Sequence, residues 1–95
     1  METRGFDFHR RAFMALGELS EAEQAAVLER LEALAETPPR DWHARVVRRA
    51  GVATPLYLIR IDDSLRVLIA ASDGRAPQVV DIVRHETLQQ FATAE

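Results

Sequence analysis

Hydrophobic and polar positions follow two different periods along the chain, and the period changes near residue 44. Before that point, apolar side chains recur every three to four residues over 9–19 and 20–37, which is typical of amphipathic helices. After it, they recur every second residue in short runs, which is typical of strands. The pattern therefore predicts a helical region followed by a β-rich region.

The helical region is preceded by a short alternating run, 4–8, which predicts a strand built around Phe6 and Phe8. The next segment predicts a first helix of two to three turns, which Gly17 weakens or ends. The apolar face of this helix is expected to hold Ala12, Phe13, Leu16 and Leu19.

The second helix is expected to start at Ser20, because Ser20 and Glu23 have the S-x-x-E spacing of a capping box. Thr37-Pro38-Pro39 should end it, since the residue before a proline is disfavoured in helical conformation. The two helices together predict an αα-hairpin. The apolar stripe of the second helix is expected to hold Val27, Leu28, Leu31, Leu34 and Ala35.

Four β-rich runs follow, and the breaks between them carry Gly, Pro, Asp and Ser, which favour turns. Consecutive strands with such short breaks form an antiparallel meander. Residues 85–95, with Leu88 and Phe91, predict a short closing helix. The expected fold is one α+β domain over 1–95, with four to five strands and the helices on one face of the sheet. The runs are 44–49, 56–61, 65–71 and 78–83.

Composition narrows the class of protein. The chain has 95 residues, 47% of them hydrophobic, which suits one soluble globular domain. It has no cysteine, no secretory signal pattern and no apolar run long enough to span a membrane, so we expect a cytoplasmic protein without a membrane partner. The net charge of -3 argues against nucleic-acid binding over the whole surface.

The charge is unevenly distributed. Six glutamates against the single Arg30 make residues 18–36 acidic, and we interpret them as a solvated helix face. All twelve basic residues are arginines, whose planar fork suits carboxylate or phosphate, although codon bias explains the absence of lysine as well. The glutamates are Glu18, Glu21, Glu23, Glu29, Glu32 and Glu36.

Two arginines interrupt the hairpin over 57–68, and its register decides what they do. With a three-residue loop over 62–64, Arg60 lies directly opposite Arg66 on one sheet face, whereas a two-residue loop separates them. An odd-length turn in the next hairpin can bring Arg84 opposite Arg66 as well. Such a row suggests an anionic ligand such as RNA phosphate. Alternatively, four nearby carboxylates neutralise the row: Asp62, Asp63, Asp81 and Glu86.

His85 follows Arg84 at the end of the last run, and its imidazole titrates nearest to neutral pH, which suits proton transfer in phosphodiester cleavage. A lone histidine is more often a surface residue. His9 and His43 have no spacing that joins them to His85, so we assign both to structure or surface. Trp42 could stack on a base or cover the edge of the sheet, and covering is more common.

Three segments, in this order, resemble the toxins of bacterial type II toxin-antitoxin systems, the RelE/ParE superfamily. Residues 6–38 resemble the opening strand and helical hairpin of the family, 56–74 its hairpin ending in R-V-L, and 79–91 its closing strand. The likeness covers nearly the whole chain. It implies a toxin that enters the ribosomal A site and cuts mRNA there, using basic residues on the concave sheet face to help the 2′-hydroxyl attack.

Carried over to this chain, the resemblance implies RNA-binding roles for Arg60 and also for Arg48 and Arg49. It implies catalytic roles for Arg66, Arg84 and His85. Many relatives have His-Arg-Asp where this chain has Arg84-His85-Glu86, so His85 takes the usual arginine position. A second basic position of the family is Leu58 here.

Three functions are therefore weighed. The first is a ribosome-dependent mRNA endonuclease, the second a ParE-like inhibitor of DNA gyrase, and the third a catalytically silent protein-binding module. All three predict a small, partly disordered antitoxin as partner, and the first adds the ribosome and mRNA. No metal or organic cofactor is implied, because cleavage in the family relies on protein groups.

Overall fold

The computed structural model of the protein describes residues 2–3, 5–42, 44–47, 54–71 and 75–86. Six strands and two α-helices are found there, together with one short 3-10 helix, Pro39–Asp41. The predicted closing helix after residue 86 lies outside these residues. In chain order the elements are β1 (Glu2–Thr3), β2 (Phe6–Phe8), α1 (Arg10–Gly17), α2 (Glu21–Ala35), β3 (Arg45–Val47), β4 (Leu56–Arg60), β5 (Leu65–Ala70) and β6 (Gln78–Arg84).

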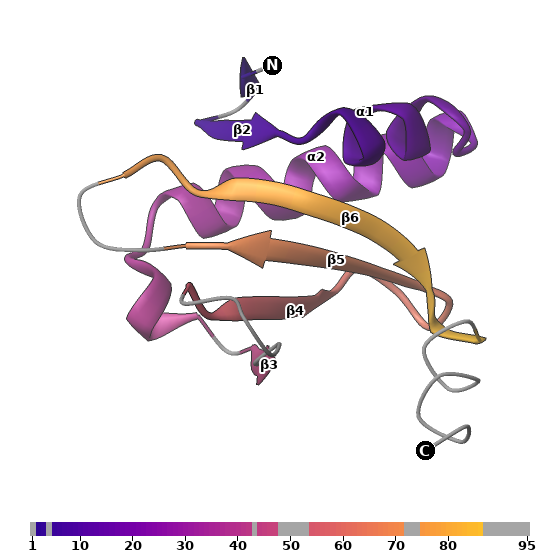
Figure 1. Ribbon diagram of the computed structural model, residues 1–95. Helices are drawn as coiled ribbons and strands as arrows, with labels where there is room; N and C mark the ends of the chain where they lie inside the picture. Colours follow the sequence, from indigo (N-terminus) through magenta and orange to yellow (C-terminus); the bar gives the residue numbers. More distant parts are fainter. Residues whose placement is uncertain (1, 4, 43, 48–53, 72–74, 87–95) are drawn as a thin grey trace.

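The strands form one sheet in the order β1-β2-β6-β5-β4-β3, and both helices lie on one side of it (Figure 1). Strands β3 to β6 pair antiparallel with their neighbours in sequence, which confirms the predicted meander. The α+β class and the helical hairpin are confirmed as well.

The N-terminal strand β2 joins the sheet beside the last strand, β6, and runs parallel to it. The backbone N–H of Asp7 donates to the carbonyl oxygen of Pro77 at 2.9 Å, and that of His9 donates to Val79 at the same distance. The sequence predicted the strand but not its neighbour. It also missed β1, a two-residue strand that pairs with β2 beyond Gly5, whose φ of 82° only glycine adopts readily.

Both helices begin at side-chain caps. In α2, the hydroxyl of Ser20 accepts from the backbone N–H of Glu23, and the Glu23 carboxylate accepts from that of Ser20, both at 3.1 Å. The predicted capping box is therefore present. In α1, the cap is His9, whose Nδ1 accepts from the backbone N–H of Arg11 at 3.2 Å. The helix ends at Gly17, as expected.

The core lies between the helices and the sheet. Helix α1 contributes Ala12 but leaves Phe13 43% exposed, so the prediction that Phe13 lies on the core-facing side of this helix was wrong. The preceding residue, Ala12, is the one that faces the sheet. Ala35, predicted on the stripe of α2, is also exposed because it stands at the helix end. The fully buried side chains from both layers are Phe6, Val27, Leu31, Ile59, Leu65, Val67, Ile69 and Val79.

Candidate functional site

The turn between β4 and β5 places Arg60 directly opposite Arg66. The turn is the three-residue one, over 62–64, and the backbone N–H of Ile61 donates to the carbonyl oxygen of Leu65 at 3.0 Å to close it. One step along the ladder, Ile59 and Val67 are a buried pair that faces the helices. Because side chains alternate along a strand, Arg60 and Arg66 share the opposite face, here called the open face.

Arg60 is paired on the turn itself. Its guanidinium forms an ion pair with Asp63, three residues along, and both side chains are mostly exposed. The neighbouring Asp62 accepts from the backbone N–H of Ser64 at 2.8 Å and from its hydroxyl at 3.1 Å. The backbone hydrogen bond from Ser64 lowers the pKa of the Asp62 carboxyl, so this side chain stays ionised.

Arg66 has a different environment. Its Nη1 donates to the backbone carbonyl oxygens of Asp62 and, at 3.0 Å, of Leu65. Within the described residues, no carboxylate forms an ion pair with it. Arg66 is half-buried, and its guanidinium keeps other N–H donors beyond the one used here. It is thus a positive charge held at the end of the sheet by neutral partners.

Arg84 does not complete a row of three arginines, because it lies opposite Leu65 whereas Arg66 lies opposite Val83. The cause is a bulge in β6: Leu68 pairs with Asp81 and Ile69 with Val79, so Val80 is an extra residue. An extra residue reverses the side on which the following side chains point. Arg84 therefore shares the face of buried Leu65, toward the helices.

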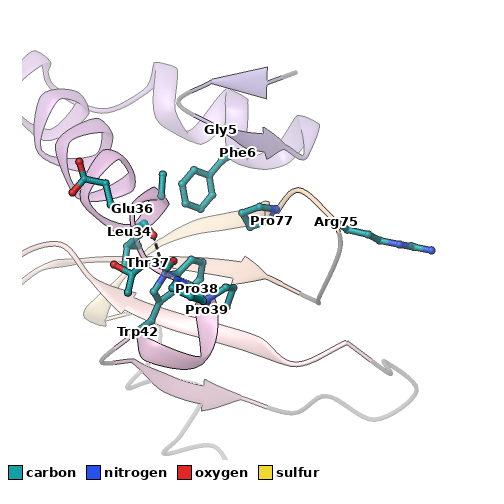
Figure 2. A pocket seen from close by; sticks show the side chains of 11 residues that line it. Gly5, Phe6, Leu34, Glu36, Thr37, Pro38, Pro39, Trp42, Arg75 and Pro77 are labelled. Carbon is teal, nitrogen blue, oxygen red and sulfur yellow. Dashed lines mark hydrogen bonds between the residues drawn. The ribbon is translucent and has the colours of Figure 1, made fainter.

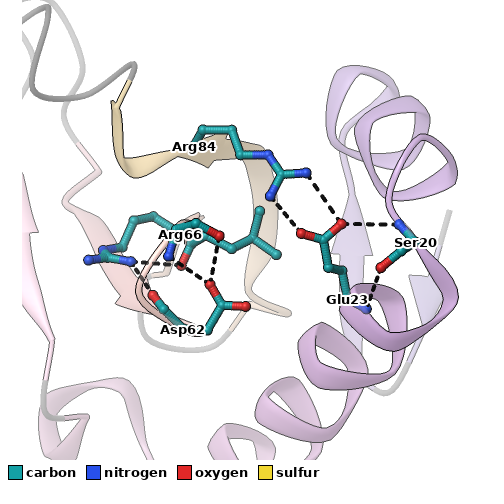
Figure 3. A network of polar contacts seen from close by, with 7 residues as sticks. Ser20, Glu23, Asp62, Arg66 and Arg84 are labelled. Atoms are coloured by element: carbon teal, nitrogen blue, oxygen red, sulfur yellow. Dashed lines mark hydrogen bonds and ion pairs between the residues drawn. The ribbon is translucent and has the colours of Figure 1, made fainter.

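Arg84 forms a two-point ion pair with Glu23 of α2 (Figure 3). The distances are 2.6 Å from Nη1 to Oε2 and 3.3 Å from Nη2 to Oε1. The pair, with the backbone N–H of Ser20, lowers the pKa of Glu23 from 4.5 to about 2. It also raises the pKa of Arg84. We expected Glu23 to belong to a solvated acidic face of the helix. Instead, its carboxylate connects the first turn of α2 to the end of β6.

His85 lies immediately beyond β6. Its backbone N–H donates to the carbonyl oxygen of Ser64 at 2.8 Å, so the residue is held beside the turn that carries Arg60 and Arg66. The structure thus brings together three of the predicted site residues, Arg60, Arg66 and His85, and turns Arg84 away. Arg48 and Arg49 lie outside the described residues.

Comparison with solved structures now identifies the fold. A chain of the archaeal RelE-RelB complex from Pyrococcus horikoshii OT3 has a TM-score of 0.62 and 23% identity, covering 83% of this chain and 91% of that chain. The isolated E. coli RelE toxin has a TM-score of 0.64 and 16% identity, covering 94% of this chain and 95% of that chain. The chain has the RelE toxin fold. No protein-family model matches the sequence, and no curated protein matches it.

Trp42 is a core residue of this RelE fold and not a platform for a base. It is 8% exposed, and its Nε1 donates to the carbonyl oxygens of Leu34 and Thr37, both at 3.0 Å. Its ring stacks on Phe6 at 6.2 Å and meets the edge of Tyr57 at 5.3 Å. The interpretation that Trp42 covers the sheet is therefore confirmed.

A pocket of about 390 Å³ opens beside Trp42, at the C-terminal end of α2 (Figure 2). Phe6, Leu34, Pro38 and Pro77 make much of its wall apolar. The charged residues on its lining are Glu36 and Arg75, and the Arg75 side chain extends away from the pocket. The pocket lies on the helix side of the sheet and is separate from the open face.

Neither a metal-ligand cluster nor a membrane-spanning helix is found among the described residues. No group of three or more His, Cys, Asp or Glu side chains there could hold a metal ion. No helix in the same ranges combines the length and apolar character that crossing a membrane requires. At the sheet end, the described residues place the side chains of Arg60 and Arg66 on one face and hydrogen-bond the backbone of His85 to the turn between them.

Proposed function

We propose that the chain is the toxin of a type II toxin-antitoxin pair and that it cleaves mRNA on the ribosome. The observation that carries the proposal is the fold, which is shared with the E. coli RelE toxin over nearly the full length of both chains. The order of segments in the sequence supports it independently. RNA, the ribosome and the antitoxin are thus its proposed partners.

The proposed chemistry uses the open face. Arg60 and Arg66 bind the phosphates on either side of the cut, and Arg66 stabilises the charge that builds up on the phosphoryl oxygens. His85 acts as acid or base. The 2′-hydroxyl loses its proton and attacks the adjacent phosphorus, the bond to the 5′-oxygen breaks, and that oxygen takes up a proton. The products are a 2′,3′-cyclic phosphate and a 5′-hydroxyl.

This scheme draws on the position of the residues. Arg60 and Arg66 are opposite each other, and the backbone of His85 is hydrogen-bonded to the turn between them. Arg66 is supported by carbonyl oxygens alone within the described residues, so an approaching phosphate displaces no carboxylate from it. Arg60 must give up Asp63, but an exposed ion pair is weak and is easily exchanged for phosphate.

The proposed antitoxin is a separate small protein with a segment that folds on binding. Its support is the archaeal structure, in which a RelE is in complex with a RelB. In this chain, an acidic antitoxin segment would cover the open face and neutralise Arg60 and Arg66, which would prevent RNA from binding.

A second candidate is a catalytically silent module of the same fold that binds only protein. Two observations favour the silent module. Arg84 forms an ion pair with Glu23, and on the open face Leu58 and Leu68 lie opposite each other next to the two arginines. An apolar patch beside two charges suits a protein interface as well as RNA.

The test is to express the chain under tight control and to measure growth together with mRNA cleavage on ribosomes. Cuts within codons that Arg66→Ala and His85→Ala both abolish would support the nuclease. Growth arrest without cleavage but with poisoned gyrase would replace it with the gyrase inhibitor. A chain that neither arrests growth nor cuts mRNA would leave the silent module.

A further inference from the structure

The ion pair between Glu23 and Arg84 joins two parts of the chain that are 61 residues apart. Arg84 is the last residue of β6, and Glu23 lies in the first turn of α2. The two-point geometry is the one in which a guanidinium matches a carboxylate best. The pair therefore fixes the end of β6 relative to the helical layer.

Glu23 is itself held in place. Its Oε1 accepts from the backbone N–H of Ser20, and its own N–H donates to the Ser20 hydroxyl. A carboxylate fixed in a capping box loses little further freedom when it binds a guanidinium, so the pair is more than a chance surface contact. Another ion pair that reaches β6 is looser: the guanidinium of Arg11 lies 4.0 Å from the carboxylate of Asp81, and the Arg11 side chain is 75% exposed.

The residue after Arg84 is His85, whose N–H donates to the carbonyl oxygen of Ser64. Ser64 is two residues from Arg66 and belongs to the turn that carries both open-face arginines. We infer that Arg84 is a positioning residue: by binding Glu23 it holds the end of β6 so that His85 stays beside Ser64, and it does not itself contact RNA.

The same ion pair has another possible meaning. Glu23 could withhold Arg84 from RNA, and release of Arg84 would then add a third guanidinium to the site. The geometry favours positioning, because Arg84 is on the helix side of the sheet, opposite Leu65, and would have to pass around the strand end to reach the open face. The two roles predict opposite effects of removing Glu23.

The first test needs no RNA. Hydrogen exchange of the His85 amide is compared in the wild type, Glu23→Gln, Arg84→Gln and the double variant. Glutamine at position 23 keeps the capping box, so the helix start is preserved. Each single change should speed exchange about two- to five-fold, as for an exposed pair, and the double variant should exchange no faster than either. Unchanged exchange in both single variants would overturn the inference.

Arg11→Gln is the matched control, since it removes an arginine that approaches β6 from α1 at longer range. It should leave the His85 amide unchanged. Arg84→Lys should restore part of the protection, because an ammonium group keeps the charge and one hydrogen bond.

The second test concerns the role in cleavage, which rests on the proposed function. In single-turnover cleavage, Arg84→Gln should lower the cleavage rate when it is introduced into the wild type. In the Glu23→Gln background it should lower the rate no further. The affinity for RNA should stay the same in all variants. An additional loss of affinity in that background would mean that Arg84 contacts RNA. Faster cleavage by Glu23→Gln would mean that Glu23 withholds Arg84, and either result overturns the inference. If the wild type does not cut RNA, the proposed function fails. Hydrogen exchange of the His85 amide then decides alone whether Arg84 is a positioning residue.

Discussion

Arg60 and Arg66 lie directly opposite each other on the face of the sheet that the helices leave open. Two like charges in this position repel each other. Asp63 offsets the charge of Arg60, and the carbonyl oxygens of Asp62 and Leu65 support Arg66. The charge of Arg66 remains without a carboxylate among the described residues, so an anion placed here would relieve the repulsion.

Arg66→Ala should weaken the binding of single-stranded RNA and make it less sensitive to salt. Loss of one phosphate contact should reduce the slope of log K against log salt concentration by about 0.7. Fluorescence anisotropy at four or five salt concentrations measures this slope. Arg30→Ala, which removes an exposed arginine from α2, serves as the control and should leave the slope unchanged. An equal slope for wild type and Arg66→Ala would argue against a phosphate contact.

Acid should destabilise the fold through Glu23. The pKa of this carboxyl is about 2 in the folded chain against an ordinary value of 4.5, so between these values the unfolded chain binds more protons. The free energy of unfolding is therefore expected to fall as the pH drops from about 4.5 to about 2. The lowered pKa of Asp62 adds to the effect in the same direction.

Urea unfolding followed by circular dichroism between pH 2 and pH 7 measures this dependence. Glu23→Gln should flatten the curve in the stated window, and Glu29→Gln, which changes an exposed glutamate of the same helix, should not. A curve for Glu23→Gln as steep as that of the wild type would contradict the assignment.

Leu31→Ala should be strongly destabilising, by about 2–5 kcal/mol, because the side chain is fully buried between α2 and the sheet and its removal leaves a cavity. Met14→Ala is the comparison, since Met14 is 58% exposed on α1 and its loss should change stability by no more than about 0.5 kcal/mol. Chemical denaturation of both variants gives the two values, and similar losses would mean that the core is misplaced.

Trp42→Phe should cost about 1–3 kcal/mol, because it removes a buried donor that bonds the carbonyl oxygens of both Leu34 and Thr37 at the end of α2. Tyr57→Phe keeps the ring that meets Trp42 and should be nearly neutral, since no hydrogen bond of its hydroxyl is found within the described residues. Thermal unfolding by circular dichroism ranks the variants. Equal midpoints for Trp42→Phe and the wild type would mean that the two hydrogen bonds of the Trp42 ring do not stabilise the end of α2.

Local signals in the sequence predicted much of the structure. The capping box at Ser20 and Glu23, the end of the second helix near the two prolines, and the period-2 runs all depend on residues close together in the chain. The opposition of Arg60 and Arg66 belongs to the same class, because the length of one short turn fixes it.

Features that depend on distant residues were not predictable. Nothing near Phe6 indicates that β2 pairs with β6. Nothing in the alternation around Val80 signals a bulge, so the sequence left open which face of the sheet Arg84 takes. The second role of Glu23 was missed for the same reason, because its partner is 61 residues away. His9 is not among the residues typical of a helix start, so its cap could not be expected.

The parallel pairing of β2 with β6 also bears on how the chain is made. Phe8 lies beside Val79, and no strand lies between β2 and β6 in the sheet. During synthesis, the first core strand must therefore wait for its partner until more than three quarters of the chain has been translated. Until then, Phe6 and Phe8 have no completed sheet to pack against. The nascent chain therefore exposes hydrophobic surface, which favours aggregation or binding by a chaperone. The sheet of this fold is therefore completed only once β6, the last of the described strands in sequence, has been translated.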